Sequence, residues 1–315
     1  MCWHFVLMFC VVTRHTHTVL LIGGPHKSGT TILWDAIRHH PELSGFGDSF
    51  DTGVSYSEGI LMQNVYPKFG IGMEFRRDNA KKMEGLGKYA LANENLVHWT
   101  EERPEAKQME NLALLMNRFA PFWDNVNATV LVEKSPPNAV ISRFLDALYN
   151  VNSTSNRPVT KFLFITRHPI ANAYSHEKVM LGTVKFRHLL ENYVKVHEYM
   201  INDMPKLRNT PKLVRLEDFT MKPEKTLKSI FKWLGIDSSN EMVHDMLYNQ
   251  LSRPIERDPN AKYRKIWCQK NIENNDSVNV FQKRLDKLKL GYDMVGWCDG
   301  YVVEGGDGVG EFDEL

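Results

Sequence analysis

The feature that most restricts the fold of this 315-residue chain is an alternation of apolar runs with helical patterns. Four short runs are largely apolar rather than alternating, as in strands covered on both faces: residues 18–24, 128–134, 161–167 and 212–218. A stretch with the spacing of an amphipathic helix follows each run. The alternation predicts one doubly wound parallel sheet of the α/β class, flanked by helices, with ligands at the carboxyl ends of its strands.

The rest of the chain is organised around this predicted sheet. Residues 44–125 form a long, mostly helical insertion after the first strand and helix, and no internal repeat or low-complexity linker divides residues 18–300. Residues 1–17 are an apolar N-terminal segment, and residues 301–315 are an acidic, glycine-rich tail that we predict to be disordered. We therefore expect a single domain over residues 18–300.

The charged residues are unevenly distributed. Lys and Arg total 39 and Asp and Glu total 38, but the last fifteen residues hold five of the acids and no Lys or Arg. Residues 1–300 therefore carry a formal excess of six positive charges. This excess is too small for a protein that coats nucleic acid, and it suits a small ligand with several negative charges.

The four cysteines, Cys2, Cys10, Cys268 and Cys298, are too few and too scattered for a disulfide scaffold, and none forms a C-x-x-C pair. We therefore expect no metal site. Cys268 and Cys298 could pair in an oxidising compartment, but their small number favours unpaired or buried thiols.

Three weak signals favour the lumen of the secretory pathway, Golgi or endoplasmic reticulum, over the cytoplasm. The apolar residues 1–12 are fewer than the roughly 20 that span a membrane, so they fit the remainder of an anchor, with membrane association, or a first strand. Sequons begin at Asn127, Asn152 and Asn275, which predicts a glycoprotein. The chain also ends in Asp-Glu-Leu, similar to lumenal retention signals.

A glycine-rich loop joins the first predicted strand to its helix and reads Gly23-Gly24-Pro25-His26-Lys27-Ser28-Gly29-Thr30-Thr31. Backbone N–H groups and a helix N-terminus collect around a phosphate in this context, while Lys27 adds charge and Thr30 and Thr31 add hydroxyls. The nucleoside-triphosphate pattern places Gly directly before Lys, whereas here Lys27 precedes Ser-Gly. No strand ends in a convincing magnesium-binding aspartate, so the loop predicts phosphate binding and disfavours a P-loop kinase.

Three other segments carry a family resemblance together with the loop. Arg167 ends a strand and Ser175 follows eight residues later; Glu133-Lys134-Ser135-Pro136 ends another strand; and residues 214–219 precede a helix that ends in Leu234-Gly235. Together these segments resemble the sulfotransferases that use 3′-phosphoadenosine 5′-phosphosulfate (PAPS), in particular the carbohydrate-type and bacterial members. The resemblance extends from about residue 19 to residue 267.

The resemblance implies a P-loop NTPase-like fold and transfer of a sulfuryl group from PAPS to an acceptor hydroxyl or amine by in-line displacement. It implies that the 5′-phosphosulfate contacts the loop and that Arg167 and Ser175 hold the 3′-phosphate. The loop contacts come from six consecutive residues: His26, Lys27, Ser28, Gly29, Thr30 and Thr31. Lys27 would stabilise the leaving oxygen, and no metal is required. The released product is 3′-phosphoadenosine 5′-phosphate (PAP).

The resemblance also points to the catalytic base, because carbohydrate-type members place a glutamate some 30 residues after the loop lysine. Glu58 follows Lys27 by 31 residues and is the first candidate. Asp48, Asp51 and the pair His39-His40 are alternatives, the histidines because imidazole titrates near neutral pH.

Other residues of the predicted strand ends and of the late segment are further site candidates. Lys134 either faces the sulfonate or acceptor or pairs with a nearby acid. Lys262 and Tyr263 belong to a segment that resembles the part of the family's chain that folds over the nucleotide, which implies that they hold its 3′-phosphate and adenine. For Arg215, Glu217 and Asp218 a structural role in bracing the sheet is favoured.

The acceptor is the least constrained part of the prediction. Five aromatic residues of the insertion fit either a sugar site or a small core: Phe46, Tyr56, Tyr66, Phe69 and Trp99. A carbohydrate acceptor is implied by the resemblance only. A P-loop nucleotide kinase and a non-catalytic nucleotide-binding scaffold are the alternatives, and a scaffold would not need Lys27, Arg167, Ser175 and Glu58 together.

Overall fold

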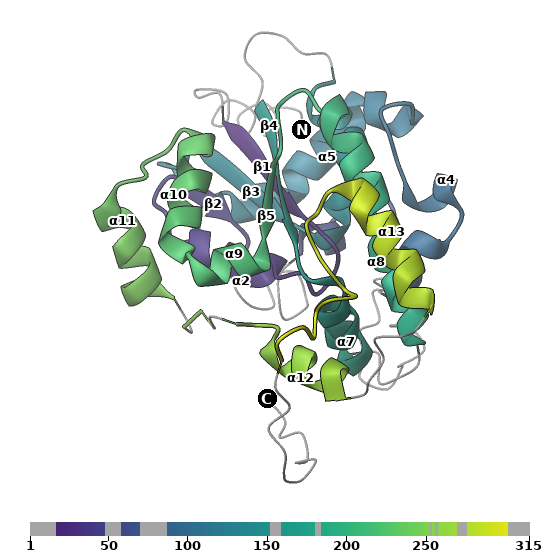
Figure 1. Ribbon diagram of the computed structural model, residues 1–315. Coiled ribbons are helices and arrows are strands. Elements are labelled where there is room, and N and C mark those ends of the chain that lie inside the picture. The colour runs from purple at the N-terminus through teal and green to yellow at the C-terminus, as the bar shows by residue number, and fades with distance from the viewer. Residues whose placement is uncertain are drawn as a thin grey trace, which may run out of the picture.

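The computed structural model describes residues 17–47, 58–69, 87–151, 159–179, 184–251, 254–255, 258–269 and 276–301. Within these residues, five strands form one parallel sheet in the order β2-β3-β1-β4-β5 (Figure 1). The strands are β1 (Thr18–Gly23), β2 (Leu43–Gly45), β3 (Val130–Lys134), β4 (Val159–Thr166) and β5 (Lys212–Arg215). The predicted α/β class with a helix-flanked parallel sheet is confirmed.

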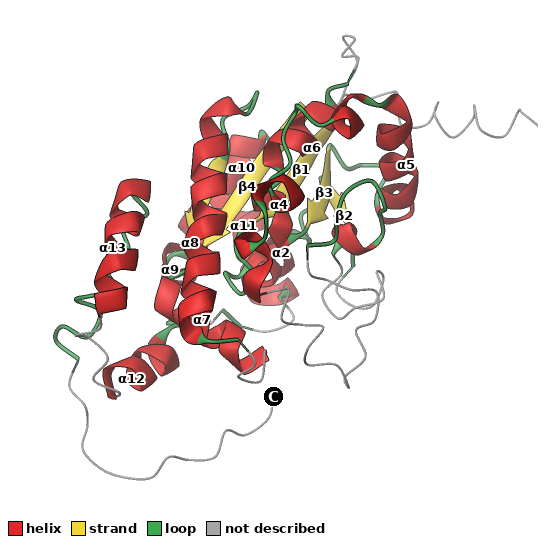
Figure 2. Ribbon diagram, turned by 90° about the vertical axis from the view of Figure 1, so that its right-hand side faces the viewer, coloured by secondary structure: helices red, strands yellow, loops and turns green. Residues whose placement is uncertain are grey.

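Helices cover both faces of the sheet. Side chains alternate along β1: Val19 and Leu21 join one core cluster, whereas Leu20 and Ile22 join the other. The first cluster packs mainly on α6 (Ser142–Tyr149), α7 (Pro169–Val179), α8 (Phe186–Asp203), α12 (Ala261–Gln269) and α13 (Asp276–Leu288). The second packs on α2 (Thr30–Ile37), α9 (Leu216–Met221), α10 (Pro223–Leu234) and α11 (Asn240–Asp245). Figure 2 shows α8 and α10 on opposite sides of the strands.

The largest differences from the sequence prediction are an earlier end of the fourth predicted strand and an additional short strand. The fourth predicted strand ends at Arg215 rather than Asp218, because Leu216 begins α9 and the acids Glu217 and Asp218 lie in its first turn, where the helix dipole favours them. Strand β2 was not predicted, since its three residues are too short to show a pattern. Gly235 ends α10 in the left-handed conformation, with a φ of 85°, as the sequence indicated.

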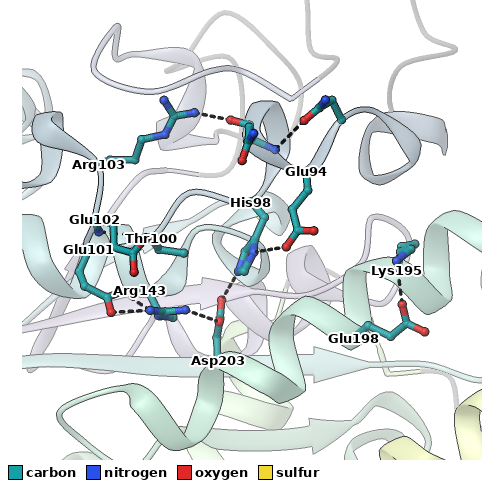
Figure 3. A network of polar contacts seen from close by, with 12 residues as sticks. Glu94, His98, Thr100, Glu101, Glu102, Arg103, Arg143, Lys195, Glu198 and Asp203 are labelled. Atoms are coloured by element: carbon teal, nitrogen blue, oxygen red, sulfur yellow. Dashed lines mark hydrogen bonds and ion pairs between the residues drawn. The ribbon is translucent and has the colours of Figure 1, made fainter.

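The insertion is tied to the sheet domain by polar contacts that Figure 3 shows from close by. It contains α4 (Glu94–Val97) and α5 (Met109–Phe119). His98, after α4, lies 2.8 Å from the fully buried carboxylate of Asp203 at the end of α8. Arg143 on α6 pairs with Glu101 and lies 3.6 Å from the other oxygen of Asp203. These pairs fix the insertion against α6 and α8.

Several sequence predictions fall outside the described residues: the N-terminal segment, all but the first residue of the tail, and two of the three sequons. Asn127, which begins the remaining sequon, is exposed in a turn before β3. Among the described residues, no helix is both long and apolar enough to cross a membrane.

Candidate functional site

The predicted phosphate loop lies at the carboxyl end of β1, the central strand of the sheet. A Cβ at Gly24 would overlap the carbonyl oxygen of Ile165 on β4, so only glycine allows the loop to pass there. Gly29 is the N-cap of α2 and has a φ of 98°. Because Gly29 has no side chain, it leaves the N–H groups in the first turn of α2 to an external acceptor.

Helix α7 holds the loop from the side. The Asn172 side-chain amide donates to the carbonyl oxygen of His26, at 2.8 Å, and to the hydroxyl of Ser28, at 3.0 Å. Ser28 is fully buried. Ser175, the candidate 3′-phosphate ligand, lies three residues after Asn172 and therefore on a similar side of α7. The loop and Ser175 are thus brought to one region.

Two basic side chains of the loop are electrostatically perturbed. Burial lowers the pKa of Lys27; the nearby Arg167 lowers it further, and Glu58 raises it. Burial, together with the charges of Lys27 and Lys134, lowers the pKa of His26 to about 3, so its imidazole is neutral near pH 7. Lys27 itself adopts a left-handed backbone, with a φ of 65°. The lysine is the loop's cation, and Glu58 is close enough to stabilise its charge.

Glu58 lies directly before a 3₁₀ turn, Gly59–Leu61, beside the end of β3. Its Oε1 is 3.2 Å from Nζ of Lys134, and the Lys134 side chain is only 1% exposed against 13% for Glu58. The ion-pair interpretation of Lys134 is therefore confirmed. The structure thus places the Glu58 carboxylate in contact with Lys134 and near enough to Lys27 for its charge to raise the pKa of that lysine.

Arg167 directly follows the last residue of β4, and its side chain is buried. Its guanidinium donates to Oδ1 of Asn260 at 2.8 Å, to the carbonyl oxygen of Pro259 at 2.6 Å and to that of Lys27 at 3.2 Å. It also lies 5.1 Å from the ring centroid of Tyr263. Arg167 therefore joins the phosphate loop to the segment that begins α12.

Tyr263 is buried, whereas Lys262 is exposed and lies 5.1 Å from the same ring. Trp267, one further turn along α12, is 1% exposed and belongs to the core. Of the late basic and aromatic residues, Lys262 and Tyr263 thus lie near Arg167, while Trp267 serves packing.

Glu217 is the centre of a second network, as its favoured structural role predicted. Its carboxylate accepts from the backbone N–H of His168 at 2.7 Å, from the Asn260 amide at 2.6 Å and from the Tyr292 hydroxyl at 3.0 Å. Arg215 lies 4.4 Å from the Tyr292 ring. The network joins α9, the end of β4 and the residues after α13.

The preference for unpaired thiols was wrong, because Cys268 and Cys298 form a disulfide with a Cα–Cα distance of 5.6 Å. The two cysteines are 30 residues apart in sequence, so no local pattern indicated that they pair. The chain after α13 returns to α12, where Arg264 donates to the carbonyl oxygens of Trp297 and Asp299. Trp297 in turn stacks on His168, at 3.9 Å between ring centroids.

Two groups of candidates lie away from the site. The aromatic residues that could have lined a sugar site, Phe46, Tyr66, Phe69 and Trp99, are at most 9% exposed and form core; Tyr56 lies outside the described residues. His40 follows the far end of α2, roughly 12 Å along the helix from the loop, and bonds to the carbonyl of Asp237. It is not placed to act as a base. Asp48 and Asp51 lie outside the described residues.

Sequence reasoning assigned no role to Asn172, Asn260 or Glu133, which hold the site together. Asn172 sits three residues after Pro169 on the helix predicted to follow a phosphate-binding strand end, and that position could have indicated a loop contact. Asn260 gave no such signal, because its partners Arg167 and Glu217 are distant in sequence. Glu133 bonds to the nearby Ser135 and Asn138, but the backbone groups that these two side chains also contact, at Ile60 and Ile22, are distant in sequence. No group of three or more metal-ligating side chains is found in the described part of the chain.

Comparisons with known proteins show the family to which the chain belongs. A family model described as "Sulfotransferase family" matches residues 20–240. No curated protein matches. Among solved structures, the sulfotransferase domain of the Synechococcus PCC 7002 olefin synthase is 19% identical, covering 80% of this chain and 89% of that domain, with a TM-score of 0.47.

Two other solved structures are similar over most of the chain. A sulfotransferase from Alicyclobacillus acidocaldarius is 16% identical, covering 90% of this chain and 98% of its own, with a TM-score of 0.43. A retinol dehydratase in complex with androsterone and inactive cofactor PAP is 14% identical, covering 90% and 84%, with a TM-score of 0.40. The family match spans well over half of the chain and includes the loop, Glu58 and Arg167.

Proposed function

Because the chain belongs to the sulfotransferase family and is a sulfotransferase enzyme, we propose that it moves the sulfuryl group of PAPS to a hydroxyl group, or an amine, of a carbohydrate acceptor. The observation that carries the proposal is the grouping of Lys27, Glu58 and Lys134 at the carboxyl ends of β1 and β3. A cation for the leaving group and a carboxylate for the acceptor proton lie together there.

The loop fits the phosphosulfate end of the donor. The N-cap glycine of α2 leaves backbone N–H groups to an anion, and Thr30 and Thr31 add hydroxyls in the first turn. Lys27 and the backbone of Ser28 and Gly29 complete this half of the proposed binding site. The neutral imidazole of His26 adds no charge beside Lys27.

The second half of the proposed donor site is formed by Arg167, Ser175, Lys262 and Tyr263. A 3′-phosphate bound by Arg167 would share the guanidinium with the oxygens of Asn260 and Pro259. Tyr263, packed beside this guanidinium, offers an aromatic face, and the exposed Lys262 offers a mobile positive charge.

In the proposed reaction, Glu58 accepts the proton of the acceptor hydroxyl while the hydroxyl oxygen bonds to sulfur. The bond between sulfur and the bridging phosphate oxygen breaks in line, and Lys27 stabilises the negative charge that develops on that oxygen. Lys134 orients Glu58 through their 3.2 Å contact. The products are the sulfated acceptor, PAP and a proton held by Glu58.

A lumenal location in the secretory pathway also remains part of the proposal. The Cys268–Cys298 disulfide supports an oxidising compartment, since such bonds are rare where thiols are kept reduced. The sequon at Asn127 is exposed and therefore accessible to glycosylation.

The activity is tested by incubating the purified chain with ³⁵S-labelled PAPS and a panel of mono- and oligosaccharides, with phenols and amines as separate arms. We expect label to appear on a saccharide as PAP accumulates. Label on a phenol alone would replace the carbohydrate proposal. If no acceptor is labelled and PAP does not bind, the proposed donor is wrong. The variant Lys27→Ala is the background control.

A further inference from the structure

One buried acid beside the site takes no part in the chemistry above. Glu133, the penultimate residue of β3, is 0% exposed. Burial raises the pKa of its carboxyl to about 7, although hydrogen bonds from Ser135 and Asn138 and the charge of Lys134 act in the opposite direction. Burying an ionisable group costs free energy of desolvation unless its contacts compensate for it. The contacts of Glu133 therefore indicate its role.

The first contact leads to the turn that carries Glu58. The Ser135 hydroxyl donates to Oε1 of Glu133 and accepts from the backbone N–H of Ile60 at 3.0 Å. Gly59 packs directly on the same carboxylate: a Cβ there would lie 2.5 Å from Cγ of Glu133. Glu133 thus supports the two residues that follow Glu58, one through a hydrogen-bond bridge and one by close contact.

The second contact leads to the phosphate loop. The Asn138 amide donates to Oε2 of Glu133 and, at 3.0 Å, to the carbonyl oxygen of Ile22. Ile22 immediately precedes Gly23, where the loop begins. A Cβ at Gly23 would lie 3.0 Å from Cβ of Asn138, so the strand end and this side chain are also in close contact.

From these contacts we infer that Glu133 is a positioning residue, which uses Ser135 and Asn138 to hold the Glu58 turn and the Lys27 loop at a fixed separation. The inference rests on the proposed function, because it assumes that Glu58 and Lys27 act on the same reacting group. Two loops from different parts of the chain are joined through one carboxylate, one contact for each of its oxygens.

A carboxylate suits this position because both of its neighbours donate. Ser135 and Asn138 each direct a hydrogen at one oxygen, so the group must accept twice. In Glu133→Gln the side chain keeps its shape, but its NH₂ group meets a donor on one side, and one of the two links breaks. Ser135→Ala removes only the link to Ile60 and leaves the Asn138 link intact.

The hydrogen-bond link is tested by hydrogen exchange of the Ile60 amide in the full chain. In Ser135→Ala we expect exchange roughly tenfold faster, as the loss of one buried hydrogen bond allows. Ser142→Ala is the matched control: Ser142 is equally buried, and its hydroxyl has no partner among the described residues. Unchanged exchange at Ile60 in Ser135→Ala would overturn the link.

The positioning role is tested by a split between binding and rate. In Glu133→Gln we expect turnover of ³⁵S-PAPS with the best saccharide of the panel to fall roughly 10²-fold, the effect of a small misplacement of reacting groups. The calorimetric Kd for PAP should change less than threefold. Asp146→Asn is the control, since Asp146 is a buried carboxylate of α6 that also accepts hydrogen bonds on both oxygens, from Thr160, Asn150 and the Arg208 N–H.

Equal rate losses in Glu133→Gln and Asp146→Asn would reduce Glu133 to a structural role and overturn the inference. Failure of the proposed function is distinguishable from this outcome, because the unsubstituted chain would then neither bind PAP nor turn over PAPS. The exchange rate of Ile60 would still report the hydrogen-bond link in that case.

Discussion

The two ends of the candidate site are built in different ways. At one end, Lys27, Glu58 and Lys134 lie where the adjacent strands β1 and β3 end, held by the pairing of these strands and by the contacts of Glu58 and Ile60 with Lys134 and Ser135. At the other end, Arg167 and Tyr263 are held by Asn260, Glu217 and the Cys268–Cys298 disulfide, which lie between about 50 and 130 residues after Arg167 in the chain. We expect the first end to govern the chemical step and the second to govern nucleotide binding.

The largest effect should come from removing the cation of the first end. Lys27→Ala should lower turnover by roughly 10²- to 10³-fold, because the leaving oxygen loses its charge stabilisation. The measurement is single-turnover transfer from labelled PAPS, with Lys232→Ala, an exposed lysine of α10, as the control. Turnover within twofold of the unsubstituted chain would remove Lys27 from the mechanism.

The second prediction concerns the Cys268–Cys298 disulfide, which stabilises the other end of the site. Cys268→Ser with Cys298→Ser should lower the free energy of unfolding by about 3–4 kcal/mol, since the disulfide closes a loop of 30 residues. The affinity for PAP should fall more than the rate of the chemical step at saturating donor. Thermal unfolding and calorimetry measure both, and the double variant Cys2→Ser with Cys10→Ser is the control that keeps the disulfide.

A loss confined to the chemical step in the disulfide variant would contradict the division between the two ends. Equal stability with and without the bond would show that the contacts of Arg264 with Trp297 and Asp299 suffice to hold the second end.

The smallest effect should arise at the insertion network of Figure 3, which touches neither end. Burial lowers the pKa of His98, but hydrogen bonds and charges of Asp203 and Glu94 outweigh it and raise the pKa. The stabilisation is therefore complete below the unfolded pKa of about 6.5 and is lost as the pH rises through the higher folded pKa.

As the pH rises above about 6.5, the free energy of unfolding should therefore fall more in the unsubstituted chain than in His98→Gln. Denaturant titrations at several pH values measure this difference, and PAP affinity serves as the internal control. A parallel pH dependence in both proteins would remove the His98–Asp203 pair as a source of stability.

The comparison also explains what the sequence could predict. The four main strands and the loop were predictable because apolar runs and glycine positions act locally. Glu58 was selected as the candidate base only because of the spacing implied by the family resemblance, and its role stays a prediction. The second end depended on partners far apart in sequence, such as Asn260 with Arg167 and Cys268 with Cys298. The sequence also could not show which aromatic residues are buried. Phe46 and Trp99 fitted a sugar-binding surface and a hydrophobic core equally well, and the structure places both in the core.

The most direct test of the central claim is to separate donor binding from proton transfer with Glu58→Gln. The amide keeps the size of the side chain but cannot accept the proton. We predict that calorimetry gives the same PAP affinity as the unsubstituted chain, within about threefold, while turnover of labelled PAPS falls at least roughly 10²-fold. Undiminished turnover would contradict the role of Glu58, and binding of ATP with magnesium but not PAP would contradict the account as a whole.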